Sequence, residues 1–144
     1  MRMKSVDKDL VEAKFDIIER NLKFLKEFEN MDESSFMRNF RDIQASKYSL
    51  LEITEACIDI ANHIIASEGY RRAETYSDMF DILLEERVIN KKPADRLTEM
   101  AGFRNLLVHR YGEIDDKHVL EIIQKDMKDV KMFMKGVSKF LEDE

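Results

Sequence analysis

The near absence of helix-breaking residues constrains the fold of this chain more than any other feature. Its 144 residues include one proline and four glycines, whereas Leu, Ile, Glu and Lys are frequent. Proline and glycine disfavour a helix interior most strongly, and Leu, Glu and Lys favour it. The chain is therefore predicted to be almost entirely helical. Its length suits one domain spanning residues 1–144, long enough to bury a core.

Apolar residues recur every three to four positions, the period of an amphipathic helix. This spacing predicts long helices over residues 6–30, 34 to about 67, 93 to about 111, and 115 or 116 to near the end. A shorter helix is predicted from Thr75 or Ser77 through Arg87. The expected fold class is all-α, an up-and-down bundle of four main helices plus a short extra helix.

Capping residues predict where these helices begin and end. Ser and Asp are favoured N-caps, and the predicted ones are Ser5, Ser34 or Ser35, and Asp115 or Asp116. Gly69 is predicted to end the second long helix, because glycine readily adopts the left-handed conformation of a C-cap. Pro93 is expected at or next to the first position of its helix, and Gly112 at its far limit.

The second long helix carries apolar residues on two faces. Leu51, Ile58 and Ile65 form a second apolar face beside the main one, which includes Phe36, Phe40 and Ile43. Apolar residues on two faces indicate that the helix is covered on both. A partner subunit is the expected cover, and an intrachain helix is the alternative.

Composition narrows the range of functions. The formal net charge of −6 argues against nonspecific nucleic-acid binding by the whole surface, although it allows a local basic site. The single cysteine, Cys57, cannot form an intrachain disulfide and is expected to be a buried thiol. There is no signal-peptide-like apolar region and no run near the roughly 20 apolar residues of a membrane span. The expected location is the cytoplasm, with no membrane contact.

One segment concentrates the residue types that handle phosphates and protons: Arg104-Asn105-Leu106-Leu107-Val108-His109-Arg110-Tyr111. On a helix, Asn105 and His109 share a face, whereas Arg104 and His109 point about 140° apart. Arg104 and His109 can converge within one chain only if the helix loosens before His109. A histidine and an arginine near a helix C-terminus are also favoured by the helix dipole, so a purely structural role is the alternative.

These residue types suit phosphodiester cleavage without a metal. Histidine, with an unperturbed pKa of about 6.5, can take a proton from a ribose 2′-hydroxyl or give one to a leaving oxygen. Arginine matches a phosphate and stays charged as negative charge builds. Asn105 could orient the imidazole or hold a phosphate oxygen. One histidine in the segment is too few for separate acid and base, unless a symmetric dimer brings two copies together.

The segment resembles the R-x4-H-x-Y motif of the HEPN superfamily, specifically its HepT-like toxins. The stretch Ala56-Cys57-Ile58-Asp59-Ile60-Ala61-Asn62-His63-Ile64-Ile65 is similar to the second-helix core of that group, so the resemblance covers essentially the whole chain. It implies a homodimeric, metal-independent endoribonuclease whose motifs meet between subunits. It also implies a type VII-like toxin paired with an antitoxin, a nucleotidyltransferase of the MNT type.

The resemblance also assigns roles by position. Arg104 and His109 would be catalytic, Asn105 would support them, and Tyr111 would accept AMP from the partner enzyme. An AMP group there would add a bulky negative charge two residues from His109 and repel RNA. No cofactor is expected.

Other chemistry-bearing residues receive weaker expectations. The three histidines are dispersed and accompany no zinc motif, so no metal site is expected. His63, one turn after Asp59, is expected to be packed or paired. Arg71 and Arg72 could extend a cationic path for RNA, but a solvated role is favoured.

Two rival functions stay open from the sequence. The first is a non-catalytic helical module that binds a nucleotide or a nucleotidyltransferase partner. The second is a purely structural dimerisation domain.

Overall fold

The computed structural model describes residues 6–143, which contain seven α-helices and no strand. The α-helices are α1 (Lys8–Leu25), α2 (Glu33–Met37), α3 (Phe40–Glu68), α4 (Tyr76–Glu85), α5 (Lys91–His109), α6 (Asp116–Lys125) and α7 (Met127–Asp143). Five of them make up the four main helices of the bundle, because α6 and α7 together form the last one, and α4 is the short extra helix. Two short 3-10 turns, η1 (Lys26–Phe28) and η2 (Tyr111–Glu113), follow α1 and α5. The expected all-α bundle is confirmed.

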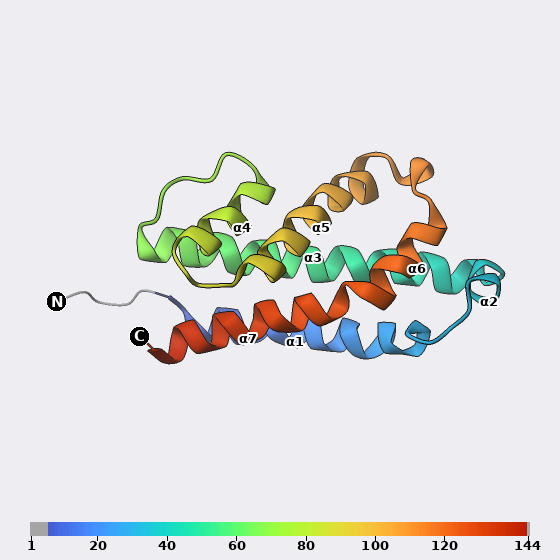
Figure 1. The fold of residues 1–144 in the computed structure, drawn as a ribbon, viewed down its shortest axis with the longest axis horizontal. Helices are drawn as coiled ribbons and strands as arrows, with labels where there is room; N and C mark the ends of the chain where they lie inside the picture. Colours follow the sequence, from blue (N-terminus) through green and yellow to red (C-terminus); the bar gives the residue numbers. More distant parts are fainter. Residues whose placement is uncertain (1–5, 144) are drawn as a thin grey trace.

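Helix α3 forms the central axis of the bundle. Successive main helices alternate in direction, with α1 and α7 along one side of α3 and α4 and α5 along the other (Figure 1). Among residues 6–143 no helix is long and apolar enough to cross a membrane.

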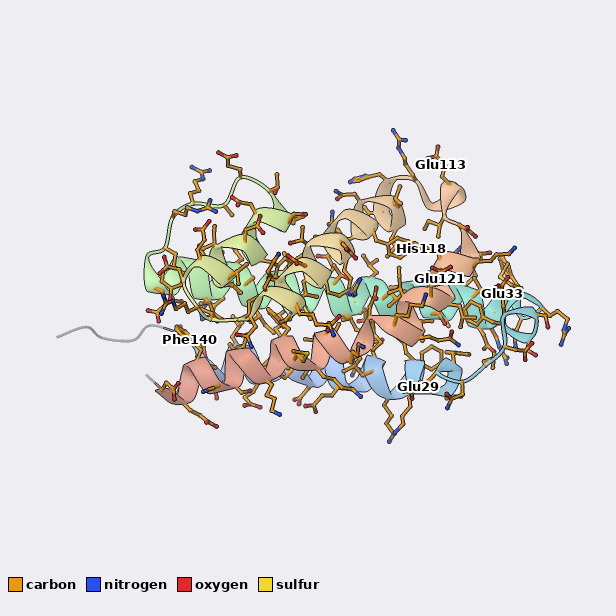
Figure 2. The ribbon with its side chains drawn as sticks, in the orientation of Figure 1. Glu29, Glu33, Glu113, His118, Glu121 and Phe140 are labelled. Carbon is orange, nitrogen blue, oxygen red and sulfur yellow. The ribbon has the colours of Figure 1, made fainter. Side chains whose placement is uncertain are left out.

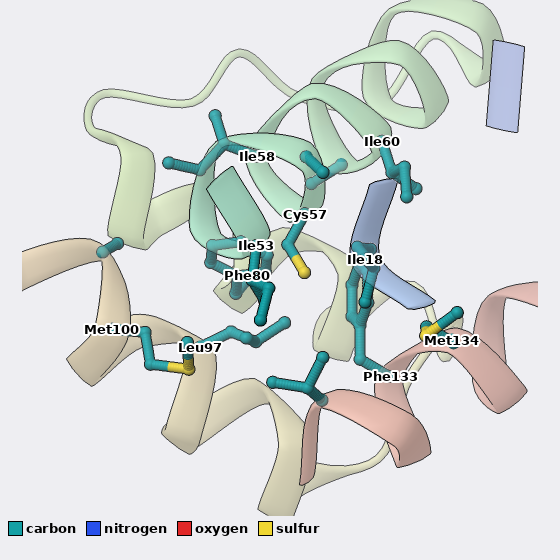
Figure 3. Close-up of a cluster of buried hydrophobic side chains, with 14 of the residues drawn as sticks. Ile18, Ile53, Cys57, Ile58, Ile60, Phe80, Leu97, Met100, Phe133 and Met134 are labelled. Carbon is teal, nitrogen blue, oxygen red and sulfur yellow. The ribbon is translucent and has the colours of Figure 1, made fainter. Parts of the chain in front are cut away.

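The core lies where α3 meets the other helices. Cys57 points into a cluster with Phe80, Leu97 and Phe133, one residue from each of three other helices (Figure 3). All four side chains are inaccessible to solvent. Burial raises the pKa of the Cys57 thiol well above its usual range, because the thiolate would lose its hydration. The expectation of a buried thiol is confirmed.

Both apolar faces of α3 are covered by the chain itself. Ile58 and Ile65, on the second face, are buried, and Leu51 is half-buried. Helices α1, α4 and α5 all pack on α3. The intrachain alternative therefore holds, and the expected partner subunit is not needed here. Phe40, assigned to the main apolar face, is instead 72% exposed at the start of α3.

Several predicted caps are found. Gly69 ends α3 with a φ of 69°, and the side chain of Thr75 caps α4 by accepting the Asp78 backbone N–H. Asp115 caps α6 in the same way, accepting from Lys117. Ser5 lies outside the described residues, and α1 begins at Lys8.

Several predicted helix boundaries differ from those in the structure. The second helix does not start at Ser34 or Ser35, because Asp32 caps a single turn, α2, and Asn39 then caps α3. Helix α5 starts two residues before Pro93 and ends at His109, three residues before Gly112. The last predicted helix is divided at Asp126 into α6 and α7.

Replacing Arg87 with glycine is expected to stabilise the protein. Arg87 follows α4 with a φ of 61°, and among residues 6–143 it is the one non-glycine residue with positive φ. A left-handed conformation costs a non-glycine residue about 1–2 kcal/mol. Glycine avoids this cost but loses about 0.5–1 kcal/mol through its more flexible unfolded state. The free energy of unfolding in urea should therefore rise by up to about 1.5 kcal/mol.

Glu86→Gly is the matched control, because the neighbouring Glu86 has an ordinary φ of −87°. It should lower the free energy of unfolding. A loss of stability in both variants would show that the backbone of Arg87 carries no strain.

Candidate active site

The segment Arg104–Tyr111 begins on helix α5 and is helical up to His109. The Arg110 N–H donates to the Leu106 carbonyl at 2.9 Å, and Arg110 then leaves the helical conformation with φ −135° and ψ 46°. Helix α5 therefore does not loosen before His109. Arg104 and His109 stay on different faces of α5, as regular helix geometry requires. In Figure 2 the labelled Glu113, in η2, marks this end of the bundle.

Arg104 is held firmly at the α3–α5 contact. Its Nε donates to Oε1 of Glu55 on α3, and the guanidinium lies 5.0 Å from the centroid of the Tyr76 ring at the start of α4. Nη1 of Arg104 also lies 3.5 Å from Oδ1 of Asn105. The Arg104 side chain is 17% exposed. The ion pair with Glu55 and the cation–π contact with Tyr76 thus fix the orientation of the Arg104 guanidinium, which still reaches solvent.

His109 lies at the exposed end of α5. Among the described side chains none forms a hydrogen bond or an ion pair with it. Its imidazole therefore has no base, acid or orienting group within the described part of its own chain. Asn105 is also exposed and lies one helical turn before His109, on the same face.

The structure brings Arg104 and Asn105 together but leaves His109 apart from Arg104. Arg110 forms an exposed ion pair with Glu113 at 3.4 Å. For Tyr111, the structure describes the backbone, which lies in η2. The segment alone is therefore not a complete catalytic site within one chain.

Two residues that contact Arg104, Glu55 and Tyr76, were not predicted from the sequence. Glu55 is 49 residues before Arg104, so no local spacing connects them. Tyr76 is the first residue of α4, and no sequence motif marks an aromatic residue at this position as functional. Only the packing of α3, α4 and α5 brings these side chains together.

The surface around this site includes exposed apolar side chains. Leu106 and Val108 on α5 are 37% and 44% exposed, and Tyr48 on α3 is 62% exposed. Tyr48 and Glu55 line the same groove between α1 and α3.

The remaining candidates have structural partners. Nε2 of His63 accepts the backbone N–H of Asp7 at 2.8 Å, and Asp59 pairs with Lys14 at 2.9 Å. The expectation that His63 is packed or paired is confirmed.

Arg71 binds both Asp78 and Glu85, so its charge is neutralised within the chain. Hydrogen bonds to Glu85 and Asp78 raise the pKa of Arg71 above its usual range, and the bonds from Arg71 lower those of the two acids. Arg72 is exposed. Within residues 6–143, no group of three or more His, Cys, Asp or Glu side chains is placed to hold a metal ion.

Curated proteins similar to this chain include two nucleases named HepT. The tRNA nuclease HepT of Aphanizomenon flos-aquae is 26% identical over 139 residues, which cover 96% of this chain and 95% of that protein. The mRNA nuclease HepT of Shewanella oneidensis is 30% identical over 126 residues, covering 88% of this chain and 94% of that one.

Solved structures share the fold. The tri-AMPylated HEPN toxin of Shewanella oneidensis, in complex with an MNT antitoxin, matches with a TM-score of 0.83 at 29% identity. The match covers 91% of this chain and 98% of the toxin. The Bacillus subtilis protein YutE matches with a TM-score of 0.86 at 23% identity over 98% of this chain and 94% of that one, which supports the fold alone.

A family model described as ribonuclease HepT-like matches residues 18–137, which include Glu55, Tyr76, Arg104 and His109. The chain belongs to the ribonuclease HepT-like family of the HEPN group.

Proposed function

We propose that this protein is a metal-independent endoribonuclease, the toxin of a type VII-like HEPN/MNT toxin–antitoxin system. Residues 1–144 act as one HEPN-like domain in a cytoplasmic homodimer. The observation that carries the proposal is the Arg104–His109 pair: a fixed, partly exposed guanidinium and an exposed imidazole five residues further along α5. The relatives named tRNA and mRNA nucleases support it.

Two copies of the chain complete the site. His109 lacks a partner among the described side chains of its own chain, and exposed Leu106 and Val108 flank it. A two-fold axis near the end of α5 would cover these apolar side chains and bring two Arg104 and two His109 residues into one cleft. The composite cleft then holds one imidazole for each proton transfer.

The proposed reaction is an internal transfer at phosphorus. One His109 takes the proton of a ribose 2′-hydroxyl, whose oxygen then attacks the neighbouring phosphorus. The bond to the 5′-oxygen breaks, and His109 of the second copy gives that oxygen a proton. Arg104 stabilises the negative charge on the phosphoryl oxygens. The products are a 2′,3′-cyclic phosphate and a free 5′-hydroxyl.

Cleavage of RNA in the presence of a metal chelator tests this activity directly. The purified protein should cut tRNA or mRNA in EDTA and leave 5′-hydroxyl ends, because histidine and arginine supply all the required chemistry. The oligomeric state is measured in the same preparation by light scattering, and a dimer is expected. Absence of cleavage from unmodified protein, together with stable binding to a nucleotidyltransferase, would support the alternative of a non-catalytic binding module.

Addition of AMP to Tyr111 is expected to switch the activity off. The partner is proposed to be an MNT-type nucleotidyltransferase acting as antitoxin, as in the similar complex of the Shewanella oneidensis toxin. The phosphate of AMP would place negative charge two residues from His109 and repel RNA. After incubation with such an enzyme and ATP, intact mass should rise by one or more AMP units, and RNA cleavage should stop.

Tyr111→Phe should abolish the mass increase, because it removes the accepting hydroxyl. Tyr76→Phe is the matched control and should still be modified. An AMP-sized increment that persists in Tyr111→Phe would remove Tyr111 as the acceptor.

A further inference from the structure

A pocket lies between the start of α4 and α5, and two of its lining residues, Tyr76 and Asn105, contact Arg104. It has a volume of about 420 Å³, within the range of small-molecule sites. Its lining combines small, apolar and polar side chains from the 73–79 segment with Ala101 and Asn105 of α5. Asn105 connects the pocket to the active site, because its Oδ1 lies 3.5 Å from Nη1 of Arg104.

Tyr76 forms an aromatic wall of this pocket. The residue is 44% exposed, so much of its ring is free to contact a ligand. The guanidinium of Arg104 lies over the same ring, 5.0 Å from its centroid. An aromatic ring next to an arginine is a combination by which proteins hold a base and its phosphate together.

The walls of the pocket are held in place before any ligand binds. Thr75 caps α4 through the Asp78 N–H, and the Asp78 carboxylate accepts the Glu74 N–H. The hydroxyl of Ser77 donates to the Thr98 carbonyl on α5 at 3.2 Å, which ties the start of α4 to the opposite wall. A preformed pocket loses little entropy on binding, as a recognition site requires.

We infer that this pocket receives one base of the RNA, from a nucleotide next to the phosphate that Arg104 holds. The base stacks against Tyr76, and Asn105 contacts its polar edge. This inference rests on the proposed ribonuclease function and adds a substrate subsite to it. Because Arg104 contacts a phosphate, it cannot distinguish one base from another. The subsite adds this distinction, so that cleavage depends on the base at one position.

Filling the pocket without touching Arg104 tests the inference. Ala73 lines the pocket, whereas its exposed neighbour Arg72 does not, so Ala73→Phe and Arg72→Phe form a matched pair. Stacking of one base on an aromatic side chain contributes about 1–3 kcal/mol, which corresponds to a change of at least about fivefold. In Ala73→Phe, kcat/KM on a short RNA should fall by at least about fivefold. Arg72→Phe should not show this fall.

Tyr76 provides a second variant pair, for the case in which Ala73→Phe fails to fold. Tyr76→Phe keeps the aromatic ring and should retain the base preference of the wild-type protein, whereas Tyr76→Ala should lose this preference across an RNA library. Wild-type rates and positions in both Ala73→Phe and Tyr76→Ala would overturn the inference and leave the proposed ribonuclease function intact.

Direct binding separates the subsite from catalysis. The four ribonucleoside 5′-monophosphates are titrated into the His109→Ala dimer and followed by NMR. At least one should shift the signals of Tyr76 and Ala73, even if the protein proves not to cut RNA. Absence of such shifts with all four nucleotides would also overturn the inference.

Discussion

His109→Ala is expected to lower the rate of RNA cleavage by about 10²–10⁴-fold, the usual contribution of a positioned acid or base. Stability should change little, because His109 is exposed at the end of α5 and forms no hydrogen bond or ion pair with a described side chain. Its interaction with the helix dipole contributes at most about 1 kcal/mol. The measurement is cleavage of one RNA by both dimers, with the melting temperature as a check of folding.

His118→Ala is the matched control for this experiment. His118 is 54% exposed and lies edge-on to Phe103, with Glu121 at 3.8 Å, so it resembles His109 in exposure but lies on α6. Its replacement should leave cleavage unchanged. Equal cleavage by wild-type protein and His109→Ala would contradict the catalytic assignment.

Arg96→Ala is expected to cause the largest loss of stability. Nε of Arg96 on α5 donates to Asp129 at 3.0 Å and lies 3.2 Å from Asp126, so it joins α5 to the junction of α6 and α7. The Asp129 side chain is fully buried, and its Oδ1 has no hydrogen-bond partner among the described residues. Its hydrogen bond to Arg96 raises the pKa of the guanidinium, whereas burial raises the pKa of Asp126.

Removing Arg96 leaves the Asp129 carboxylate buried without its cation. Breaking such a pair from one side typically costs about 3–5 kcal/mol. Urea unfolding should show a loss of this size. Glu99→Ala removes a largely exposed partner of the same arginine and should cost less than about 1 kcal/mol.

The double variant Arg96→Leu/Asp129→Leu distinguishes a buried charge from simple loss of packing. It should recover most of the stability, because apolar residues can replace both charges. A double variant no more stable than Arg96→Ala, or a loss below about 1 kcal/mol in Arg96→Ala, would contradict this interpretation.

Local signals in the sequence were sufficient for the class of fold and for several helix ends. Gly69 and Thr75 act through their own backbone and near neighbours, so their capping roles follow from residue type and position. The breaks near Asn39 and Asp126 could not be predicted from the sequence, because the apolar spacing continues across both. The break at Asp126 lies where Arg96, on α5, pairs with Asp126 and Asp129, and this contact forms only in the folded bundle.

The candidate site likewise combines features that local spacing predicts with contacts that form only between packed helices. Arg104, Asn105 and His109 are close in the sequence, so their spacing alone predicted that Arg104 and His109 diverge on a regular helix. Glu55 and Tyr76 come from α3 and α4 and hold Arg104 only once the bundle has formed. The covered second face of α3 likewise required knowledge of where α1, α4 and α5 pack.

The dependence of activity on the fraction of wild-type chains tests the composite cleft most directly. Wild-type protein and His109→Ala are mixed in varied proportions, unfolded and refolded together, and assayed on one RNA. If each cleft needs both copies of His109, activity follows the square of the wild-type fraction. Half wild-type chains should then give about a quarter of full activity. Activity in direct proportion to the wild-type fraction would contradict a shared cleft, because each chain would then cut RNA with its own histidine.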